Sequence, residues 1–161
     1  MEKQTCSICG KKSKKHCGLC KAFTCKKCAH DIGKEFFSFW DPIPEDLTHG
    51  YYCNTCFVNK VSPDYNTYCE ILNRAKEMDV YFKKKHSKEV RLFKKASSII
   101  TVTDWPDYDD MILHMAFLAA KDNYNTIINV ETSSRKIHDG SYKIILWSGT
   151  AIPANKNISF L

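Results

Sequence analysis

The hydrophobic pattern of the C-terminal part of the chain predicts strands and one helix. Residues 99–103 are all β-branched, which favours a strand. From Tyr108 to Ala119, apolar side chains recur at every third or fourth position, as on the buried face of a helix. Strands are predicted again at residues 126–132 and 142–150, with a polar loop and turn at residues 133–140. This β-α-β-β order predicts an α+β fold, with one helix on a small antiparallel or mixed sheet.

The middle of the chain shows helical periodicity followed by a basic run. Ser62, Pro63 and Asp64 are typical of a helix start. The apolar residues that follow have the spacing of one helix face: Tyr65, Tyr68, Cys69, Leu72 and Ala75. Residues 82–95 then mix basic and apolar side chains. Such a run can bind nucleic acid or an anionic membrane, or its apolar members can dock on the neighbouring domain.

Composition and charge divide the chain into three parts. The net charge of +6 comes from basic residues within residues 1–60 and 74–95. We therefore expect a cysteine-rich basic module at residues 1–60, a basic helical connector at residues 61–97, and a near-neutral domain at residues 98–161. No apolar run is long enough to cross a membrane, and the charged N-terminus does not resemble a secretory signal. These features lead us to expect a cytoplasmic location.

Eight of the nine cysteines form four Cys-x-x-Cys pairs, namely Cys6/Cys9, Cys17/Cys20, Cys25/Cys28 and Cys53/Cys56. Clustered thiols in a reducing compartment are more often metal ligands than disulfides. Two such pairs complete a closed tetrahedral four-cysteine zinc site with no open position for a substrate. The sequence therefore predicts two structural Zn²⁺ ions per chain and no zinc-dependent hydrolysis.

Two ways of sharing the pairs between the ions are open. In a cross-brace, one zinc is held by Cys6, Cys9, Cys25 and Cys28, and the other by Cys17, Cys20, Cys53 and Cys56. In sequential pairing, the first pair joins the second and the third joins the fourth. Because eight sulfurs satisfy two ions, we expect His16, His30 and His49 to surround the sites or to be exposed rather than to bind metal.

Residues 14–30 (KKHCGLCKAFTCKKCAH) and 51–57 (YYCNTCF) resemble a FYVE-type double-zinc finger. The shared features are a basic stretch before the third cysteine, four residues between the second and third pairs, and an aromatic residue near the last pair. The resemblance implies a small, cross-braced, mostly loop-like domain with a C-terminal helix. It also implies either binding of phosphatidylinositol 3-phosphate or, as in a rabphilin-like branch of the fold, binding of partner proteins.

The basic motif of that family is incomplete in this chain. The family has two His before the third cysteine and an Arg after it, whereas this chain has Lys15 and His16 before Cys17 and Gly18 after it. A lysine is a point charge and lacks the bidentate phosphate geometry of arginine. We therefore expect the finger to dock a protein partner. The alternative is a peripheral binder of anionic membrane (phosphoinositide) or nucleic acid through residues 11–15 and 83–95.

Residues 118–132 (LAAKDNYNTIINVET) and 140–153 (GSYKIILWSGTAIP) resemble the YbjQ-like family, described as heavy-metal-binding. Its members form ring-like oligomers and have no established enzymatic activity, which implies a homo-oligomer here. The C-terminal part has no cysteine and only His114 and His138, so we expect no further metal site in it.

The last predicted strand gives a physical reason for such association. Alternation along it places Ile145 and Trp147 on the face opposite Tyr142, Ile144 and Leu146. One helix covers only one face of a small sheet. We therefore expect a subunit contact to cover Ile145 and Trp147, unless the connector helix does so within one chain.

The chain contains no nucleophile elbow, zincin motif or phosphate-binding loop. Residues 104–106 predict the start of the helix that contains residues 108–119, with Asp107, Asp109 and Asp110 at its positive end, which accounts for these aspartates without a magnesium site. The sequence therefore predicts a non-enzymatic zinc-binding scaffold, whose finger docks an unidentified partner and whose C-terminal domain oligomerises. A small enzyme or a metal-homeostasis protein is the remaining alternative.

Overall fold

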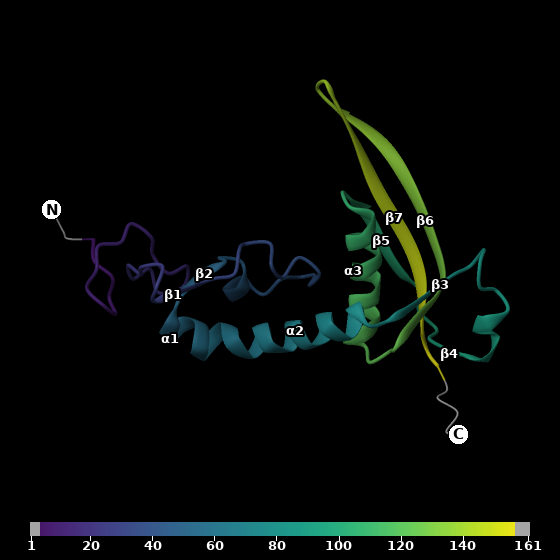
Figure 1. Ribbon diagram of the computed structural model, residues 1–161, viewed down its shortest axis with the longest axis horizontal. Coiled ribbons are helices and arrows are strands. Elements are labelled where there is room, and N and C mark those ends of the chain that lie inside the picture. Colours follow the sequence, from purple (N-terminus) through teal and green to yellow (C-terminus); the bar gives the residue numbers. More distant parts are fainter. Residues whose placement is uncertain (1–3, 157–161) are drawn as a thin grey trace. The chain divides into compact units, whose positions relative to one another are not determined.

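The computed structural model describes residues 4–156 and has an α+β fold (Figure 1). The chain divides into two compact units, Met1–Cys69 and Glu70–Leu161. This division falls within helix α2 (Ser62–Lys76) and not at residue 60 or 97, where the composition changes. Among residues 4–156, no helix combines the length and the apolar character that crossing a membrane requires.

The N-terminal unit is mostly loop with very short strands. Strands β1 (Ala29–Asp31) and β2 (Tyr51–Cys53) pair antiparallel, with His30 opposite Tyr52. Two isolated bridges, Thr5 with Lys12 and His16 with Phe23, each close a loop around one Cys-x-x-Cys pair. The short helical turn η1 (Glu45–Leu47) lies between the two strands in the sequence.

An aromatic cluster forms the core of this unit. Phe37, Leu47 and Tyr52 are fully buried, and Tyr68 of α2 is 1% exposed. The Phe37 ring contacts those of Phe36 and Tyr68, each with ring centroids 5.0 Å apart. The residues between the third and fourth cysteine pairs therefore pack on the first turns of α2.

A continuous helical segment follows the last cysteine pair. It consists of α1 (Asn54–Cys56), the π-helical turn η2 (Phe57–Val61) and α2. Helix α2 begins at Ser62, as expected, but Ser62 does not cap a free helix end, because α1 and η2 precede it and Cys53 is the N-cap of α1. Pro63 is accommodated after a π-helical turn, in which the Ser62 N–H donates to the Phe57 carbonyl.

The C-terminal unit contains a mixed sheet with the order β3-β6-β7-β4, in which β5 also pairs with β7. Its strands are β3 (Asp79–Phe82), β4 (Lys94–Lys95), β5 (Ile100–Trp105), β6 (Thr126–Asp139) and β7 (Tyr142–Asn155). The pair β3–β6 is parallel and the others are antiparallel. The strand β3 and the short strand β4 come from the segment that we expected to be a helical connector.

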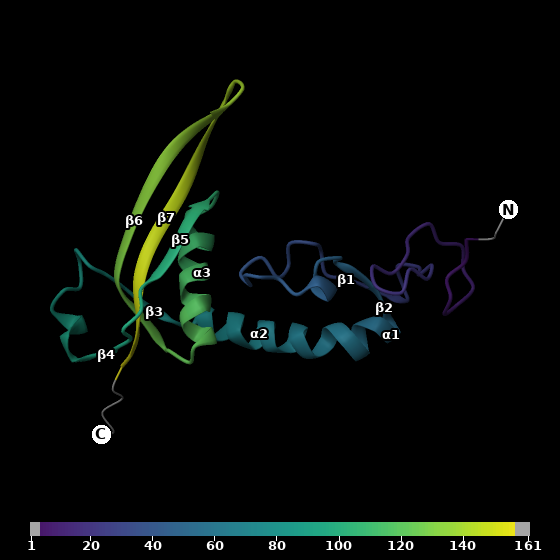
Figure 2. The same ribbon diagram turned by 180° about the vertical axis from the view of Figure 1, so that it is seen from behind.

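Helix α3 (Tyr108–Lys121) lies along one face of this sheet, as both views show (Figures 1 and 2). Asp107 caps it, since its Oδ1 accepts the Asp110 N–H at 2.9 Å. Met111 and Met115 are fully buried. A Cβ on Gly149 would lie 2.9 Å from the Met115 Cε, so this glycine allows the helix to approach β7 closely.

The basic run at residues 82–95 supplies a second, smaller core. Val90, in the turn η3 (Glu89–Leu92), is 4% exposed and packs with Ile128 and Ala154. Tyr81 and Phe93 pack against the same cluster. Two apolar members of the run, Val90 and Phe93, therefore pack on their own sheet, which was one of the alternatives left by the sequence, whereas Leu92 is exposed.

The expected loop was wrong for residues 133–139, which lie in β6, whereas the expected turn is present at Gly140. Strands β6 and β7 form one long hairpin in which Ser133 pairs with Ser148 and Asp139 pairs with Tyr142. Gly140, with φ of +59°, is the first of the two turn residues, as a type II′ hairpin turn requires. The backbone of this polar stretch still pairs with β7, because hydrogen bonds between strands do not require that a face of the hairpin be buried.

Candidate metal centres

The eight paired cysteines gather into two groups of four sulfurs. One group contains Cys6, Cys9, Cys25 and Cys28, and the other contains Cys17, Cys20, Cys53 and Cys56. Within each group the sulfur atoms all lie within 4.8 Å of one another. Each group could hold a metal ion, and the membership is that of a cross-brace and not of sequential pairing. Cys69 is half-buried and belongs to neither group.

The distances between sulfurs fit a tetrahedral zinc site. With zinc–sulfur bonds of about 2.3 Å, tetrahedral geometry places the sulfurs about 3.8 Å apart. The Sγ atoms of Cys9 and Cys25 are 3.6 Å apart, and those of Cys20 and Cys53 are 3.8 Å apart. Thiolates are also the ligands that structural zinc sites prefer. The donor set and its spacing therefore suit Zn²⁺.

Local turns explain how each pair presents two sulfurs. The chain reverses after the first pair at Gly10 (φ +70°) and after the second pair at Lys21 (φ +63°). These residues donate their N–H groups to the carbonyls of Cys6 and Cys17 at 2.9 and 3.1 Å. The fourth pair is arranged by a helix start, where the Cys56 N–H donates to Cys53 Sγ at 3.4 Å.

Backbone N–H groups pointing at sulfur favour the thiolate form of two cysteines. The N–H groups of Cys25 and Cys9 lower the pKa of the Cys6 thiol to about 6. Burial opposes ionisation of Cys17, but the N–H groups of Cys53 and Cys20 outweigh it and lower the pKa of Cys17 to about 7. Both thiols are thereby prepared to act as anionic ligands.

In each group one cysteine instead has a raised pKa, which favours its neutral thiol form. The neighbouring thiol of Cys9 is the main cause that raises the pKa of Cys28 to about 12. Burial, followed by the thiol of Cys53, raises the pKa of Cys56 to about 12. Four thiolates so close together repel one another, and a divalent cation in their midst removes that repulsion. Each group is therefore electrostatically suited to a bound cation.

Hydrogen bonds tie the loops of the two groups together. Thr24, just before Cys25, is fully buried, and its carbonyl accepts from Ser13 Oγ and from the Tyr51 hydroxyl, both at 2.9 Å. Gly18, within the second pair, donates its N–H to the Tyr51 carbonyl at 2.9 Å. Sequence reasoning missed these polar residues, and only their position beside the cysteines could have suggested a role for them.

The three histidines near the cysteines lie outside both four-sulfur groups. The His30 ring stacks on the Phe57 ring with centroids 3.9 Å apart, and His30 Nε2 lies 3.0 Å from Asn54 Oδ1. His16 contacts the edge of Phe23. His49 packs against Gly18 so closely that a Cβ there would lie 2.2 Å from His49 Cβ. These side chains surround the candidate sites and support the loops that carry the cysteines.

A basic hollow of about 370 Å³ lies beside the second cysteine pair. Its basic lining residues are Lys14, Lys15, His16, Lys34 and His49, and Asp31 and Tyr51 also contribute. Lys15 is partly engaged, since its Nζ lies 3.5 Å from Asp31 Oδ2 and 4.8 Å from the centre of the Tyr51 ring. Gly18 provides no side chain there, and the close contact with His49 leaves no room for one.

Comparisons with protein-family models, with curated proteins and with solved structures found no match to this chain. The resemblances to the FYVE-type and YbjQ-like families therefore rest on residue patterns alone.

Proposed function

We propose that this protein is a non-enzymatic interaction protein whose N-terminal unit is a FYVE-like finger stabilised by two Zn²⁺ ions. The observation that carries the proposal is the gathering of eight sulfurs into two groups with tetrahedral spacing. Four cysteines fill the coordination sphere of zinc, so neither ion would have a position open to a substrate. Such ions fix the loops of a small domain and do not catalyse a reaction.

Metal analysis tests the zinc sites. Elemental analysis of freshly purified protein should find two zinc ions per chain, and one or none would contradict the proposal. Cys25→Ser should remove one ion, and Cys6→Ser should affect that same ion. Cys69→Ser is the matched control and should leave two. A crystal structure with Cys6, Cys9, Cys17 and Cys20 around one ion would refute the cross-brace and with it the FYVE-like topology.

We propose that the finger docks a protein partner beside its first cysteine group. A hollow of about 450 Å³ is lined there by Ile8, Lys27, His30 and Asn54, among others. Ile8 is 51% exposed and gives this hollow an apolar side chain that a partner could cover. Once a partner is known, Ile8→Ser should weaken its binding and leave the zinc content unchanged. Binding that survives removal of residues 1–60 would contradict docking by the finger.

We propose that the C-terminal unit is YbjQ-like and associates with further copies of the chain. Tyr142 is 77% exposed and Ile145 is 42% exposed near the end of the β6–β7 hairpin. Trp147 was expected to lie on an uncovered face, but it packs against Tyr108 with ring centroids 4.9 Å apart. Of the two residues expected to form the subunit contact, Ile145 therefore remains. Light scattering should detect oligomers, and a monomer at ~100 μM would contradict a stable apolar interface.

The basic hollow supports a second candidate function, the binding of an anionic headgroup. Three lysines and two histidines line it, and only Asp31 carries the opposite charge. Liposomes that contain phosphatidylinositol 3-phosphate should bind more strongly than liposomes of equal charge made with phosphatidylserine. Lys14→Glu with Lys34→Glu should abolish that difference, while Lys94→Glu with Lys95→Glu serves as the control. Equal binding to both liposomes would leave only general electrostatic attraction.

A further inference from the structure

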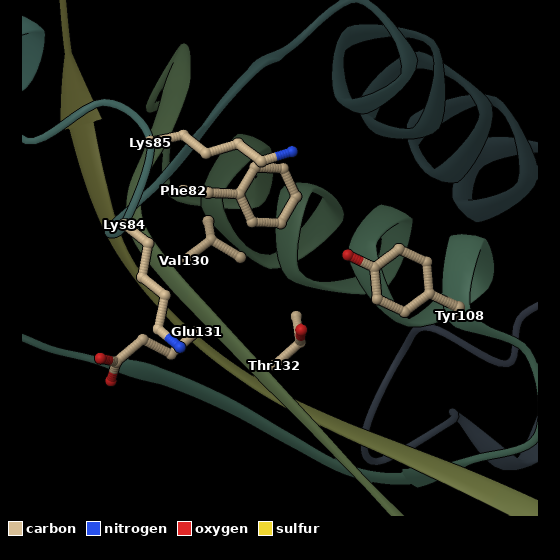
Figure 3. A pocket seen from close by; sticks show the side chains of 7 residues that line it. All are labelled: Phe82, Lys84, Lys85, Tyr108, Val130, Glu131 and Thr132. Carbon is tan, nitrogen blue, oxygen red and sulfur yellow. The ribbon is translucent and has the colours of Figure 1, made fainter.

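A further hollow lies within the C-terminal unit, where strand β3 ends beside β6. Its volume is about 460 Å³, and it is lined by Phe82, Lys84, Lys85, Tyr108, Val130, Glu131 and Thr132 (Figure 3). Val130 is 2% exposed and forms an apolar surface together with the Phe82 ring. Figure 3 shows the hydroxyl end of Tyr108 directed toward these two side chains. The hollow therefore combines an apolar surface with a polar rim.

The edge of strand β6 becomes free next to this hollow. Strand β3 pairs with β6 only as far as Phe82 opposite Val130. The last backbone bond between them is donated by the Lys83 N–H to the Val130 carbonyl at 3.2 Å. Within residues 4–156, no strand pairs with this side of β6 beyond Val130.

Alternation along β6 identifies the backbone groups at that edge. The Val130 carbonyl faces β3, so the groups two, four, six and eight residues further on face the same side. These residues are Thr132, Ser134, Lys136 and His138. All four are exposed. An edge of this kind is a ready template for pairing with another extended chain.

The charges around the hollow select the chemistry of that chain. Glu131 is already paired, since its Oε1 lies 2.7 Å from Lys83 Nζ. Lys84 and Lys85 are exposed and form no ion pair with any residue in the described part of the chain. Lys136 adds a further cation along the free edge. The net charge facing an incoming chain is therefore positive, which favours an acidic partner.

We propose that the free edge of β6 binds an extended acidic peptide of a partner protein by strand addition. Its backbone pairs with residues 132–138, and one aromatic or aliphatic side chain enters the hollow between Phe82 and Tyr108. Acidic side chains of the peptide face Lys84 and Lys85. Strand addition of this kind gains affinity from backbone hydrogen bonds and specificity from the pocket. The site uses no metal ligand and does not depend on the finger.

Fluorescence anisotropy on the full zinc-containing chain tests this proposal. The probe is a fluorescein-labelled heptapeptide, Glu-Val-Glu-Tyr-Glu-Val-Glu, which alternates acidic and apolar residues. Lys84→Glu combined with Lys85→Glu should weaken its binding by about tenfold or more, because two attractive charges become repulsive. Lys94→Glu combined with Lys95→Glu makes the same change of net charge outside the hollow and should alter binding by less than about twofold.

Backbone pairing is tested separately by amide exchange followed by NMR. On addition of the peptide, the N–H groups of Thr132, Ser134 and Lys136 should exchange more slowly, and an N-methylated version of the peptide should lose this effect together with its affinity. Absence of binding, equal loss in the two double variants, or equal binding of the N-methylated peptide would each overturn the proposal. So would slower exchange at the same N–H groups on raising the protein concentration without peptide, because a second copy would then occupy the edge.

Discussion

Replacing Phe37 with alanine should weaken zinc binding although Phe37 belongs to neither cysteine group. Phe37 is fully buried, and its ring contacts those of Trp40, Tyr65 and Tyr68 with centroids 5.8, 6.5 and 5.0 Å apart. Loss of a buried phenylalanine side chain costs about 3–5 kcal/mol, which combines the lost transfer free energy with the cavity left behind.

This cost is transmitted to the metal through folding. We expect the finger to be folded only when its ions are bound, so that the free energy of metal binding includes that of folding. If Phe37→Ala removes about 3–5 kcal/mol from the folded state, the product of the two zinc association constants falls by about two to four orders of magnitude. The stoichiometry of two ions should not change, since all eight sulfurs remain.

Competition with a fluorescent zinc chelator measures that product. Val58→Ala is the matched control, because Val58 lies in the same unit and is 55% exposed. Its binding constants should stay within about threefold of the original ones, as surface changes usually cost less than 0.5 kcal/mol. If Phe37→Ala leaves zinc affinity unchanged but lowers the melting temperature, the aromatic cluster and the metal sites fold independently and the reasoning is wrong.

Three further predictions concern protons, a helix cap and a glycine. Zinc binding should release at least one proton per ion, because the raised pKa values of Cys28 and Cys56, about 12 each, keep both thiols protonated at neutral pH without metal. The metal-free protein thus holds more protons, so affinity should rise with pH, and calorimetry in buffers of different ionisation enthalpy measures the release. Asp107→Ala should cost the C-terminal unit about 1 kcal/mol, or ~4–8 °C in melting temperature, whereas Asp107→Asn keeps an oxygen acceptor and should cost less. Gly50→Ala should destabilise the finger by more than about 2 kcal/mol in chemical denaturation, because Gly50 has φ of +75° and the added Cβ would lie 2.6 Å from the backbone of Gly33.

The sequence identified the four Cys-x-x-Cys pairs because the evidence for a pair is local, but it left open which pairs share a group. A Cys-x-x-Cys pair needs only a tight turn to present two sulfurs, and the turn residue Gly10 is visible in the sequence. Helix α3 was also predictable, because an amphipathic period is a short-range signal. Its expected start at residues 104–106 was wrong, since Asp104 and Trp105 belong to strand β5 and Asp107 caps the helix. The buried Phe117 falls outside the expected stripe, since the helix is buried over a wider arc than one face.

The missed features depend on partners that are distant in the sequence. Strand β3 pairs with residues 126–130, and nothing in residues 79–82 reveals that partner. Residues 133–139 have a polar composition typical of a loop, yet the facing residues 142–148 hold them in a regular ladder. The aromatic residues at positions 36–40 carry no periodicity, so their packing on α2 could not be read from spacing.

The cross-brace gives a physical reason why the aromatic cluster and both cysteine groups should depend on one another. Residues 29–52 begin after Cys28 of the first group and end before Cys53 of the second. Strand pairing brings these ends together, with Ala29 opposite Cys53 and the Asn54 N–H donating to the Cys28 carbonyl at 3.3 Å. Closing such a loop costs entropy, which two ions would offset by fixing its two ends. Loss of either ion would release one end of the loop that carries Phe37. Sequential pairing would instead place Cys28 and Cys53 on the same ion, and the other ion could then be lost without freeing either end of this loop.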